Sequence, residues 1–442
     1  MLQSSFLTDI LATITNRAQQ ASATRDTRPI EELSRVLLSD IGDVSAIKVA
    51  RAILQKYRGL DMGQRADFFR HLAEDFDIEP DIVAILAHRY GKSRFTEDLA
   101  ALTAQAEPRR QEILRRLNRS PGATADLVAM RCDLFEAIRS DPGLARIDLD
   151  FAHLFESWFN PGFLVLRRIN WSSPANILEK IIAYEAVHTI DNWDALRLRL
   201  LPEDRRCFAY FHPSMPEEPL IFVEVALTSG IPGNIQSVLA DDRAATPAHQ
   251  MDTAVFYSIS NCQAGLRGIS FGNALIKHVV EDLSASLPQL KTFVTLSPIP
   301  GFRAWIDGAK ETLSGTEAET LRAALAQTGR GADKIGDKAA DTLRRYIAHY
   351  LVKEKRPRGD PANAVARFHL GNGAVVHDVH AGGDNSDNGL RTSYGAMVNY
   401  LYDPARIDRN IEGFTTTGTI ATSRTIASLL KSATGLTSKE NS

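Results

Sequence analysis

Three glycines that follow a strand-like run have the spacing of a phosphate-binding loop. The apolar run FYSIS leads into a loop that contains Gly265, Gly268 and Gly272, and an amphipathic helix is predicted over about 269–286. Backbone N–H groups at a helix start bind anionic phosphate, and glycines let a ligand approach closely. Arg267 would add a charge-assisted contact. The loop has neither a P-loop nor a dinucleotide fingerprint, and a turn that needs its glycines only for packing is the alternative.

Two other groups of residues have the chemistry of a functional site. Glu224 lies inside the apolar run IFVEVALT, where burial would raise the pKa of the carboxyl group and prepare it as a general base. A core glutamate held in an ion pair is the alternative interpretation. His377 and His380 have a short metal-binding spacing, but no third and fourth ligand follow nearby and the surroundings predict a polar loop. We therefore expect no metal there.

The sequence divides into two regions with different hydrophobic patterns, and the elements of these regions must position the candidate residues. Up to about residue 159, apolar residues such as Phe68, Phe69 and Leu72 recur at helical spacing, with Gly and Pro between the periodic runs. Strand-like and helical runs then alternate, which indicates an α/β domain. The sequence predicts a helical bundle over 1–159 and an α/β domain over 160–442. In the second domain we expect strands at 162–170, 206–212, 219–228, 253–260, 291–297 and 396–402, and helices at 174–187, at 269–286, in much of 303–354 and at about 420–432.

Composition and charge exclude several classes of protein. The chain has 442 residues, 44% hydrophobic and 24% charged, so it is neither wholly disordered nor one small domain. No apolar stretch approaches the ~20 residues of a membrane helix, and a net charge of −3 gives no general attraction to nucleic acid or acidic membrane. Cys132, Cys207 and Cys262 are too scattered for a disulfide framework. The N-terminal segment lacks secretory-signal features and the chain ends in SKENS rather than SKL, so we expect a cytoplasmic protein.

Several blocks of sequence, in order, resemble the malonyl-CoA decarboxylase family. They are FHPSMPEEPL from Phe211, VALTSGIPGNIQ from Val225, FYSISNCQAGLRGI from Phe256, TLSPIPGF from Thr295, RFHLGNGA from Arg367 and YGAMVNY from Tyr394. The likeness covers essentially all of the α/β domain. It implies an N-terminal helical bundle followed by an α/β catalytic domain similar to the GCN5-related N-acetyltransferase fold. The helical N-terminus is compatible with the oligomerisation domain of that family.

The resemblance also implies a site. The functional serine and histidine of the family fall on Ser297 and His369. Its CoA-binding segment falls on Arg267, Gly268, Ile269, Ser270, Phe271, Gly272 and Asn273. The implied substrate and product are malonyl-CoA and acetyl-CoA. No cofactor is expected, because the thioester is itself the electron sink. The implied partner is a second copy of the chain, in a homo-oligomer with a tetramer favoured; no nucleic-acid or membrane partner is expected.

The chemistry of these residues agrees with decarboxylation. Loss of CO2 from malonyl-CoA leaves an acetyl-CoA enolate, which needs hydrogen-bond donors at the thioester oxygen and a proton donor for C2. Ser297 ends a strand before a stiff Pro-Ile-Pro-Gly turn, at the point where an acetyltransferase-type sheet opens for acyl-CoA. It would bind the carboxylate or the enolate. His369 titrates near neutrality and would deliver the proton, with Asn399 and Tyr394 as further candidates nearby.

Two other functions stay open on the sequence alone. An acyl-CoA N-acyltransferase would use the same loop together with an amine acceptor. A non-catalytic regulator that binds acyl-CoA would need neither Ser297 nor His369. The polar stretch between Val376 and Thr392 receives no role from the resemblance.

Overall fold

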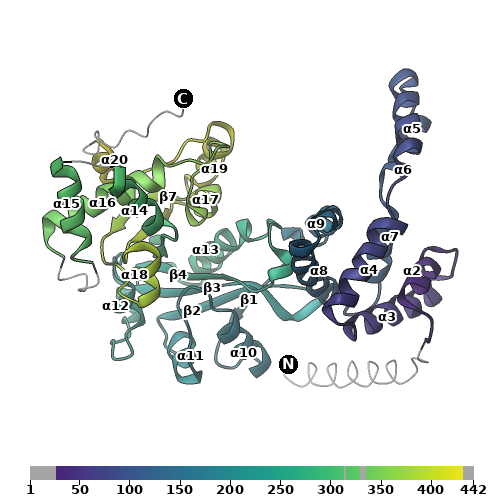
Figure 1. Ribbon diagram of the computed structural model, residues 1–442. Coiled ribbons are helices and arrows are strands. Elements are labelled where there is room, and N and C mark those ends of the chain that lie inside the picture. The colour runs from purple at the N-terminus through teal and green to yellow at the C-terminus, as the bar shows by residue number, and fades with distance from the viewer. Residues whose placement is uncertain (1–25, 313–314, 329–334, 432–442) are drawn as a thin grey trace. The chain divides into compact units, whose positions relative to one another are not determined.

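The chain forms two compact units. The computed structural model describes residues 26–312, 315–328 and 335–431. One unit is helical and contains the described residues up to Phe163, together with two short later segments, His212–Pro216 and Gln263–Ser270. The other unit contains Leu164–Phe211, Glu217–Cys262 and the described residues from Phe271 onward. Figure 1 shows the elements of both units.

Most helices of the helical unit are amphipathic, with their apolar faces in a common core; the helices Pro80–Ser93 and Thr96–Ala106 bury no apolar side chain. Phe68, Phe69 and Leu72 are almost fully buried, as their spacing predicts. Asp61 and Gln64 form a capping box, in which each side chain accepts a hydrogen bond from the backbone N–H of the other residue. The helices are α2 (Ile30–Leu38), α3 (Asp43–Arg58), α4 (Met62–Asp75), α5 (Pro80–Ser93), α6 (Thr96–Ala106), α7 (Arg109–Asn118), α8 (Ala123–Ser140) and α9 (Ala145–Trp158).

The α/β unit is built on one sheet of eight strands in its described part. The strand order is β1-β2-β3-β4-β5-β8-β6, and β7 also pairs with β8. β4 and β5 run parallel, whereas β3–β4, β5–β8 and β7–β8 are antiparallel. The strands are β1 (Val165–Ile169), β2 (Arg205–His212), β3 (Met215–Thr228), β4 (Thr253–Asn261), β5 (Thr292–Thr295), β6 (Ser297–Pro298), β7 (Val375–His380) and β8 (Met397–Tyr402).

Helices cover both faces of this sheet. Figure 1 shows α10 (Ala175–Tyr184) and α11 (Trp193–Leu200) on one face and α13 (Leu275–Ser286) on the other. This cover explains why β3 and β4 are almost continuously apolar, since strands buried on both faces lose the alternating pattern. The other helices are α12 (Ile235–Leu239), α14 (Phe302–Thr312), α15 (Gly315–Leu325), α16 (Asp337–Val352), α17 (Ala364–Gly371), α18 (Asp387–Ser393), α19 (Ile407–Thr417) and α20 (Arg424–Lys431).

All six strands predicted in this domain are present, but the polar stretch after Val376 was wrongly predicted as a loop. It contributes most of β7, whose residues Val375–His380 pair with β8, and the short helix α18. His377 and His380 therefore lie in a strand. None of the described helices has the length and hydropathy needed to cross a bilayer.

Candidate active site

The sheet opens between β4 and β5. The two strands pair from Thr253 opposite Thr292 to Phe256 opposite Thr295, and the N–H of Leu296 makes a further bond to the carbonyl of Phe256 at 3.0 Å. β4 then continues to Asn261, paired only with β3, whereas β5 and the chain that follows it pair with β8. Ser297 is the first residue of β6, just after the β4–β5 pairing ends, and lies opposite Val398. The backbone thus places Ser297 at the opening, as predicted.

Ser297 and His369 meet at this point, although 72 residues separate them in the sequence. The Oγ of Ser297 lies 3.2 Å from Nε2 of His369 and donates a hydrogen bond of 2.9 Å to Oγ1 of Thr295. Both side chains are buried. The serine hydroxyl therefore has a fixed orientation between a threonine and an imidazole.

Tyrosines of β8 hold the other side of the imidazole. The hydroxyl of Tyr402 lies 2.8 Å from Nδ1 of His369, and the ring of Tyr400 stacks on the imidazole with centroids 4.5 Å apart. Burial raises the pKa of Tyr402 well above its usual value, so its hydroxyl stays protonated and donates to Nδ1. Because Ser297 donates to Thr295, Nε2–H then donates to Ser297. The four residues form one directed chain of hydrogen bonds.

Contacts at both ends of α17, the helix that contains His369, fix the position of this histidine. Asn363 caps α17 by accepting from the N–H of Ala366 at 2.8 Å, and its side-chain amide donates to the carbonyl of Pro300 at 2.8 Å. One side chain thus ties the start of the histidine helix to the proline turn after Ser297. At the other end, Gly373 has φ +81° and a Cβ there would lie 2.5 Å from the carbonyl of Ile407, so only glycine fits.

The charge state of His369 differs from the prediction. We expected an imidazole that titrates near neutrality, but complete burial lowers the pKa of His369 to about 3. Burial disfavours the charged form, and no carboxylate offsets this effect. His369 is therefore neutral at pH 7 in the unliganded protein.

Acid should destabilise the α/β unit through its buried histidines. Burial lowers the pKa of His188 to about 4, against about 6.5 for an unfolded histidine. The unfolded state then binds more protons below pH 6.5, so this stability is present above pH 6.5 and is lost as the pH falls toward 4. By linkage, each such histidine lowers the free energy of unfolding by about 2 kcal/mol between pH 7.5 and pH 5.

Urea unfolding of the wild type and of His188→Gln at the two pH values checks this expectation. The variant should lose less stability on acidification than the wild type. The comparison between the two proteins is needed because Glu224 changes the stability in the opposite direction. Burial raises the pKa of Glu224 to about 7, so the stability that it contributes is present below pH 4.5 and is lost as the pH rises through 7. An equal loss in both proteins would contradict the assignment to His188.

The predicted CoA-binding segment connects β4 to α13. Gly268 has φ +86°, a backbone conformation that favours glycine, and Arg267, Gly268 and Ser270 are exposed. A Cβ at Gly272 would come within 3.1 Å of Ile221 and 3.3 Å of Phe368. The segment from Gln263 to Ser270 belongs to the helical unit, and the rest of the loop belongs to the α/β unit. Packing thus explains part of the glycine pattern, and the exposed turn at Gly268 is the part suited to a ligand.

Two further candidates have different surroundings. Asn399 is fully buried, donates to the carbonyl of Thr295 at 2.8 Å, and accepts from Nε2 of His380. It thereby fixes the end of β5 directly before Ser297. The hydroxyl of Tyr394 donates to Asp307 of α14 at 2.8 Å, so it joins α14 to α18. No group of three or more metal-ligating side chains occurs in the described part of the chain.

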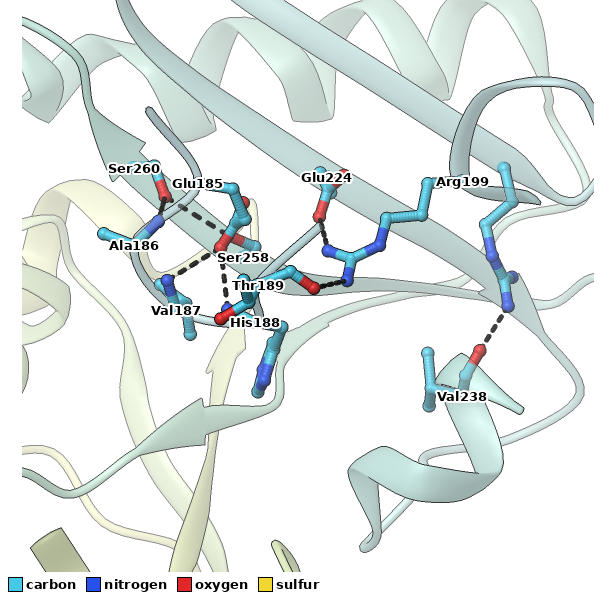
Figure 2. Close-up of polar contacts among 11 residues, drawn as sticks. Glu185, Ala186, Val187, His188, Thr189, Arg199, Glu224, Val238, Ser258 and Ser260 are labelled. Carbon is cyan, nitrogen blue, oxygen red and sulfur yellow. Dashed lines mark hydrogen bonds and ion pairs between the residues drawn. The ribbon is translucent and has the colours of Figure 1, made fainter. Parts of the chain in front are cut away.

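Glu224 lies in a buried ion pair. Its Oε2 accepts from Arg199 at 2.9 Å, and Arg199 also donates to the carbonyl of Thr189 at 3.0 Å, as Figure 2 shows. The glutamate is 0% exposed and its carboxylate is held by Arg199. Beside it, Glu185 accepts from Ser258 and from the N–H groups of the following loop. The interpretation of Glu224 as a core ion pair is supported.

Sequence reasoning missed several residues that build the site. Thr295, Asn363 and Tyr402 orient Ser297 and His369. Thr295 begins the TLSPIPGF block but received no role from it, and Asn363 and Tyr402 lie outside the quoted blocks. The spacing of Tyr400 and Tyr402 was the available signal, because residues two apart in a strand point to the same face.

The fold and this site define an α/β protein with a helical N-terminal unit and a buried serine–histidine pair at the opening of its sheet. Two family models match the chain: the malonyl-CoA decarboxylase N-terminal domain over residues 76–159 and the malonyl-CoA decarboxylase C-terminal domain over residues 162–440. The chain therefore belongs to the malonyl-CoA decarboxylase family.

Relatives and solved structures agree with this assignment. The mitochondrial malonyl-CoA decarboxylase of Anser anser anser is 36% identical over 384 residues, which cover 78% of this chain and 76% of the goose protein. The crystal structure of malonyl-CoA decarboxylase from Agrobacterium vitis has 46% identity and a TM-score of 0.85, covering 90% of this chain and 99% of that one. The Rhodopseudomonas palustris structure has 45% identity and a TM-score of 0.83, with 90% and 98% covered.

Proposed function

We propose that this protein catalyses the decarboxylation of malonyl-CoA to acetyl-CoA and CO2. The observation that carries the proposal is the buried Ser297–His369 contact at the opening of the sheet. A regulator that only binds acyl-CoA needs no such pair, and the burial of Glu224 removes the sequence argument for an amine-acylating base. Membership of the family supports the same substrate and reaction.

The proposed reaction uses the neutral state of His369. Malonyl-CoA brings a negative carboxylate to His369, whose pKa is set by burial in the described structure, and a nearby opposite charge raises the pKa of an imidazole. His369 then takes one proton from solvent as the substrate binds. The C–C bond breaks, its electron pair moves into the thioester enolate, and CO2 leaves. The proton on Nε2 moves to C2, which regenerates neutral His369, so the reaction consumes one proton overall.

Ser297 has the complementary role of binding the reacting group. Its hydroxyl lies between Nε2 of His369 and Thr295, where it can turn to the carboxylate or to the enolate oxygen. Burial helps the first step, because a carboxylate that loses water disperses its charge more readily as CO2 leaves. Tyr402 stays at Nδ1 and keeps Nε2 directed at the site.

An assay without an acceptor separates this function from the alternatives. The purified protein, treated exhaustively with a chelator, is incubated with malonyl-CoA in the absence of any amine. We expect acetyl-CoA and CO2 in equal amounts with no added cofactor. Product that forms only when an amine is added would identify an acyltransferase, binding without turnover would identify a regulator, and activity that returns only with zinc would overturn the cofactor-free mechanism.

We propose further that Arg267–Asn273 binds the diphosphate of CoA. The support is the exposed turn at Gly268, whose positive φ exposes backbone to a ligand, directly before the 3-10 turn Gly272–Ala274 that leads into α13. The Arg267 side chain adds a positive charge at the same turn. Backbone N–H groups near a helix start suit an anionic ligand.

The helical unit is proposed to form a homo-oligomer, with a tetramer favoured. The support comes from α5 and α6, which pack on each other and leave an exposed apolar surface. Exposed patches of this kind on a folded unit mark interaction sites. The surface contains Ile82, Ile85, Phe95 and Leu99, with 45%, 66%, 67% and 42% of each residue exposed.

Replacing Ile85 and Phe95 with aspartate should lower the mass measured by light scattering, because a buried charge opposes association. Leu149→Asp is the matched control, since Leu149 of α9 is 72% exposed in the same unit. Full oligomeric mass in the Ile85→Asp/Phe95→Asp variant would contradict the proposed surface.

A cytoplasmic location is proposed for the protein. The support is that Cys132, Cys207 and Cys262 are all free thiols, as expected in a reducing compartment. The vertebrate relatives are named mitochondrial, so fractionation of the native cell decides between the two compartments. Neither nucleic acid nor membrane is proposed as a partner.

A further inference from the structure

A buried arginine of the helical unit holds the loop that we assign to CoA. Arg131 lies in α8 and its side chain is 3% exposed. Its Nη1 donates to the carbonyl of Gly265 at 2.9 Å and to the carbonyl of Arg267 at 3.1 Å. Its Nε donates to Asp148 at 2.7 Å. A buried cation is costly unless it is paired and hydrogen-bonded, and here one aspartate and two loop carbonyls meet that need.

The loop fits against α8 at close range. A Cβ at Gly265 would lie 1.9 Å from the carbonyl of Val128, so this position admits only glycine. The Phe135 ring contacts two guanidinium groups, that of Arg131 at 4.8 Å and that of Arg267 at 4.3 Å. Such cation–π contacts orient an arginine side chain. Backbone and side chain of the loop are thus both fixed by one helix.

The contact with Arg131 also sets the direction of a peptide N–H. The peptide between Arg267 and Gly268 is trans, as are all the peptide bonds in the described chain, so its C=O and N–H point in opposite directions. Because the carbonyl is turned toward Arg131, the N–H of Gly268 is turned away from α8. That N–H lies at the exposed turn and is a donor proposed for the diphosphate.

We infer that Arg131 is a positioning residue for acyl-CoA binding: it orients the 265–268 backbone so that the N–H of Gly268 meets the diphosphate. This inference rests on the proposed function and on the assignment of the loop. It gives the helical unit a part in substrate affinity as well as in assembly. The residue touches neither the thioester nor the carboxylate, so it acts on binding and not on the chemical step.

The test compares Arg131→Met with the wild type on two substrates. Malonyl-CoA carries the diphosphate, and malonyl-pantetheine carries the same thioester without it. We expect kcat/KM for malonyl-CoA to fall about tenfold in the variant, because KM rises while kcat is unchanged. A tenfold change corresponds to ~1.4 kcal/mol. For malonyl-pantetheine, kcat/KM should equal that of the wild type. Direct binding of CoA should weaken by the same factor.

Two further variants keep the test decisive if Arg131→Met folds poorly. Phe135→Leu alters only a half-buried ring and should raise KM for malonyl-CoA by ~3-fold, since it loosens the same contacts. Arg110→Met is the matched control, because Arg110 is also buried in the helical unit and paired with Asp150 and Asp77. It should leave the ratio of the two substrates unchanged.

The outcomes separate this inference from the proposed function. A wild type that turns over neither substrate overturns the proposed function and the inference with it. A wild type that does not prefer malonyl-CoA to malonyl-pantetheine overturns the loop assignment. A wild type that prefers malonyl-CoA, with the preference intact in Arg131→Met and Phe135→Leu, overturns the role of Arg131 and leaves decarboxylation standing.

Discussion

Replacing His369 with alanine should lower kcat for malonyl-CoA by about 100-fold or more, the scale on which loss of a general acid acts. The imidazole is the only side chain that contacts both Ser297 and Tyr402 in the hydrogen-bond chain of the described site. Binding of a non-reactive malonyl-CoA analogue should weaken far less than kcat falls, because His369 meets the carboxylate on binding but delivers its proton to C2 only after the C–C bond has broken. Steady-state kinetics and a direct binding measurement together check this.

His188→Ala is the control for losing a buried imidazole. His188 is 9% exposed and lies in the same unit, in the loop that Glu185 holds. Its variant should lose stability but keep kcat. If His369→Ala has a normal kcat and only a raised KM, His369 binds the substrate and another group donates the proton.

Replacing Ser297 with alanine should lower kcat by about 10²–10³-fold, the usual loss for one donor that stabilises a developing oxyanion. KM should rise as well, because the hydroxyl also binds the carboxylate in the ground state. Ser34→Ala is a matched control, since Ser34 is a fully buried serine that bonds only within α2. If Ser297→Ala alters KM and leaves kcat unchanged, Ser297 does not stabilise the transition state.

The double variant tests whether the two residues act together. Their side chains are in contact at 3.2 Å, and residues in contact show interaction energies that separate residues lack. The combined loss in kcat should be smaller than the product of the two single losses. Strict multiplicativity would mean that Ser297 and His369 act in independent steps.

Much of the fold follows from local patterns in the sequence. The apolar runs of β3 and β4 predict central strands because burial on both faces leaves a continuous apolar signal. β7 escaped detection because half of its sequence, VVHDVH, is polar and four of its six residues are only partly buried. β6 contains two residues and has no periodicity to detect. Both strands form by pairing with β8, a contact between residues distant in the sequence that local patterns do not reveal.

The candidate residues could be proposed from the sequence, but their physical state could not. Ser297 and His369 were proposed through motifs, and the contact of α17 with Tyr402 of β8 brings His369 to Ser297. The neutral state of His369 depends on complete burial, which no spacing reveals. The contact between Arg131 and Gly265 joins positions 134 residues apart, and neither residue has a local pattern that indicates the other.

The return of Gln263–Ser270 to the helical unit has a consequence for synthesis of the protein. The ribosome finishes the helices long before it reaches this segment, and His212–Pro216 also comes later than Phe163. Domains generally fold as units during synthesis, N-terminal first. Here the N-terminal unit is complete only when Ser270 has emerged, by which time β1 to β4 have emerged as well. Over that interval the nascent chain therefore contains Arg131 without the loop carbonyls to which it donates. The helical unit can complete its folding only after synthesis of the α/β unit has begun.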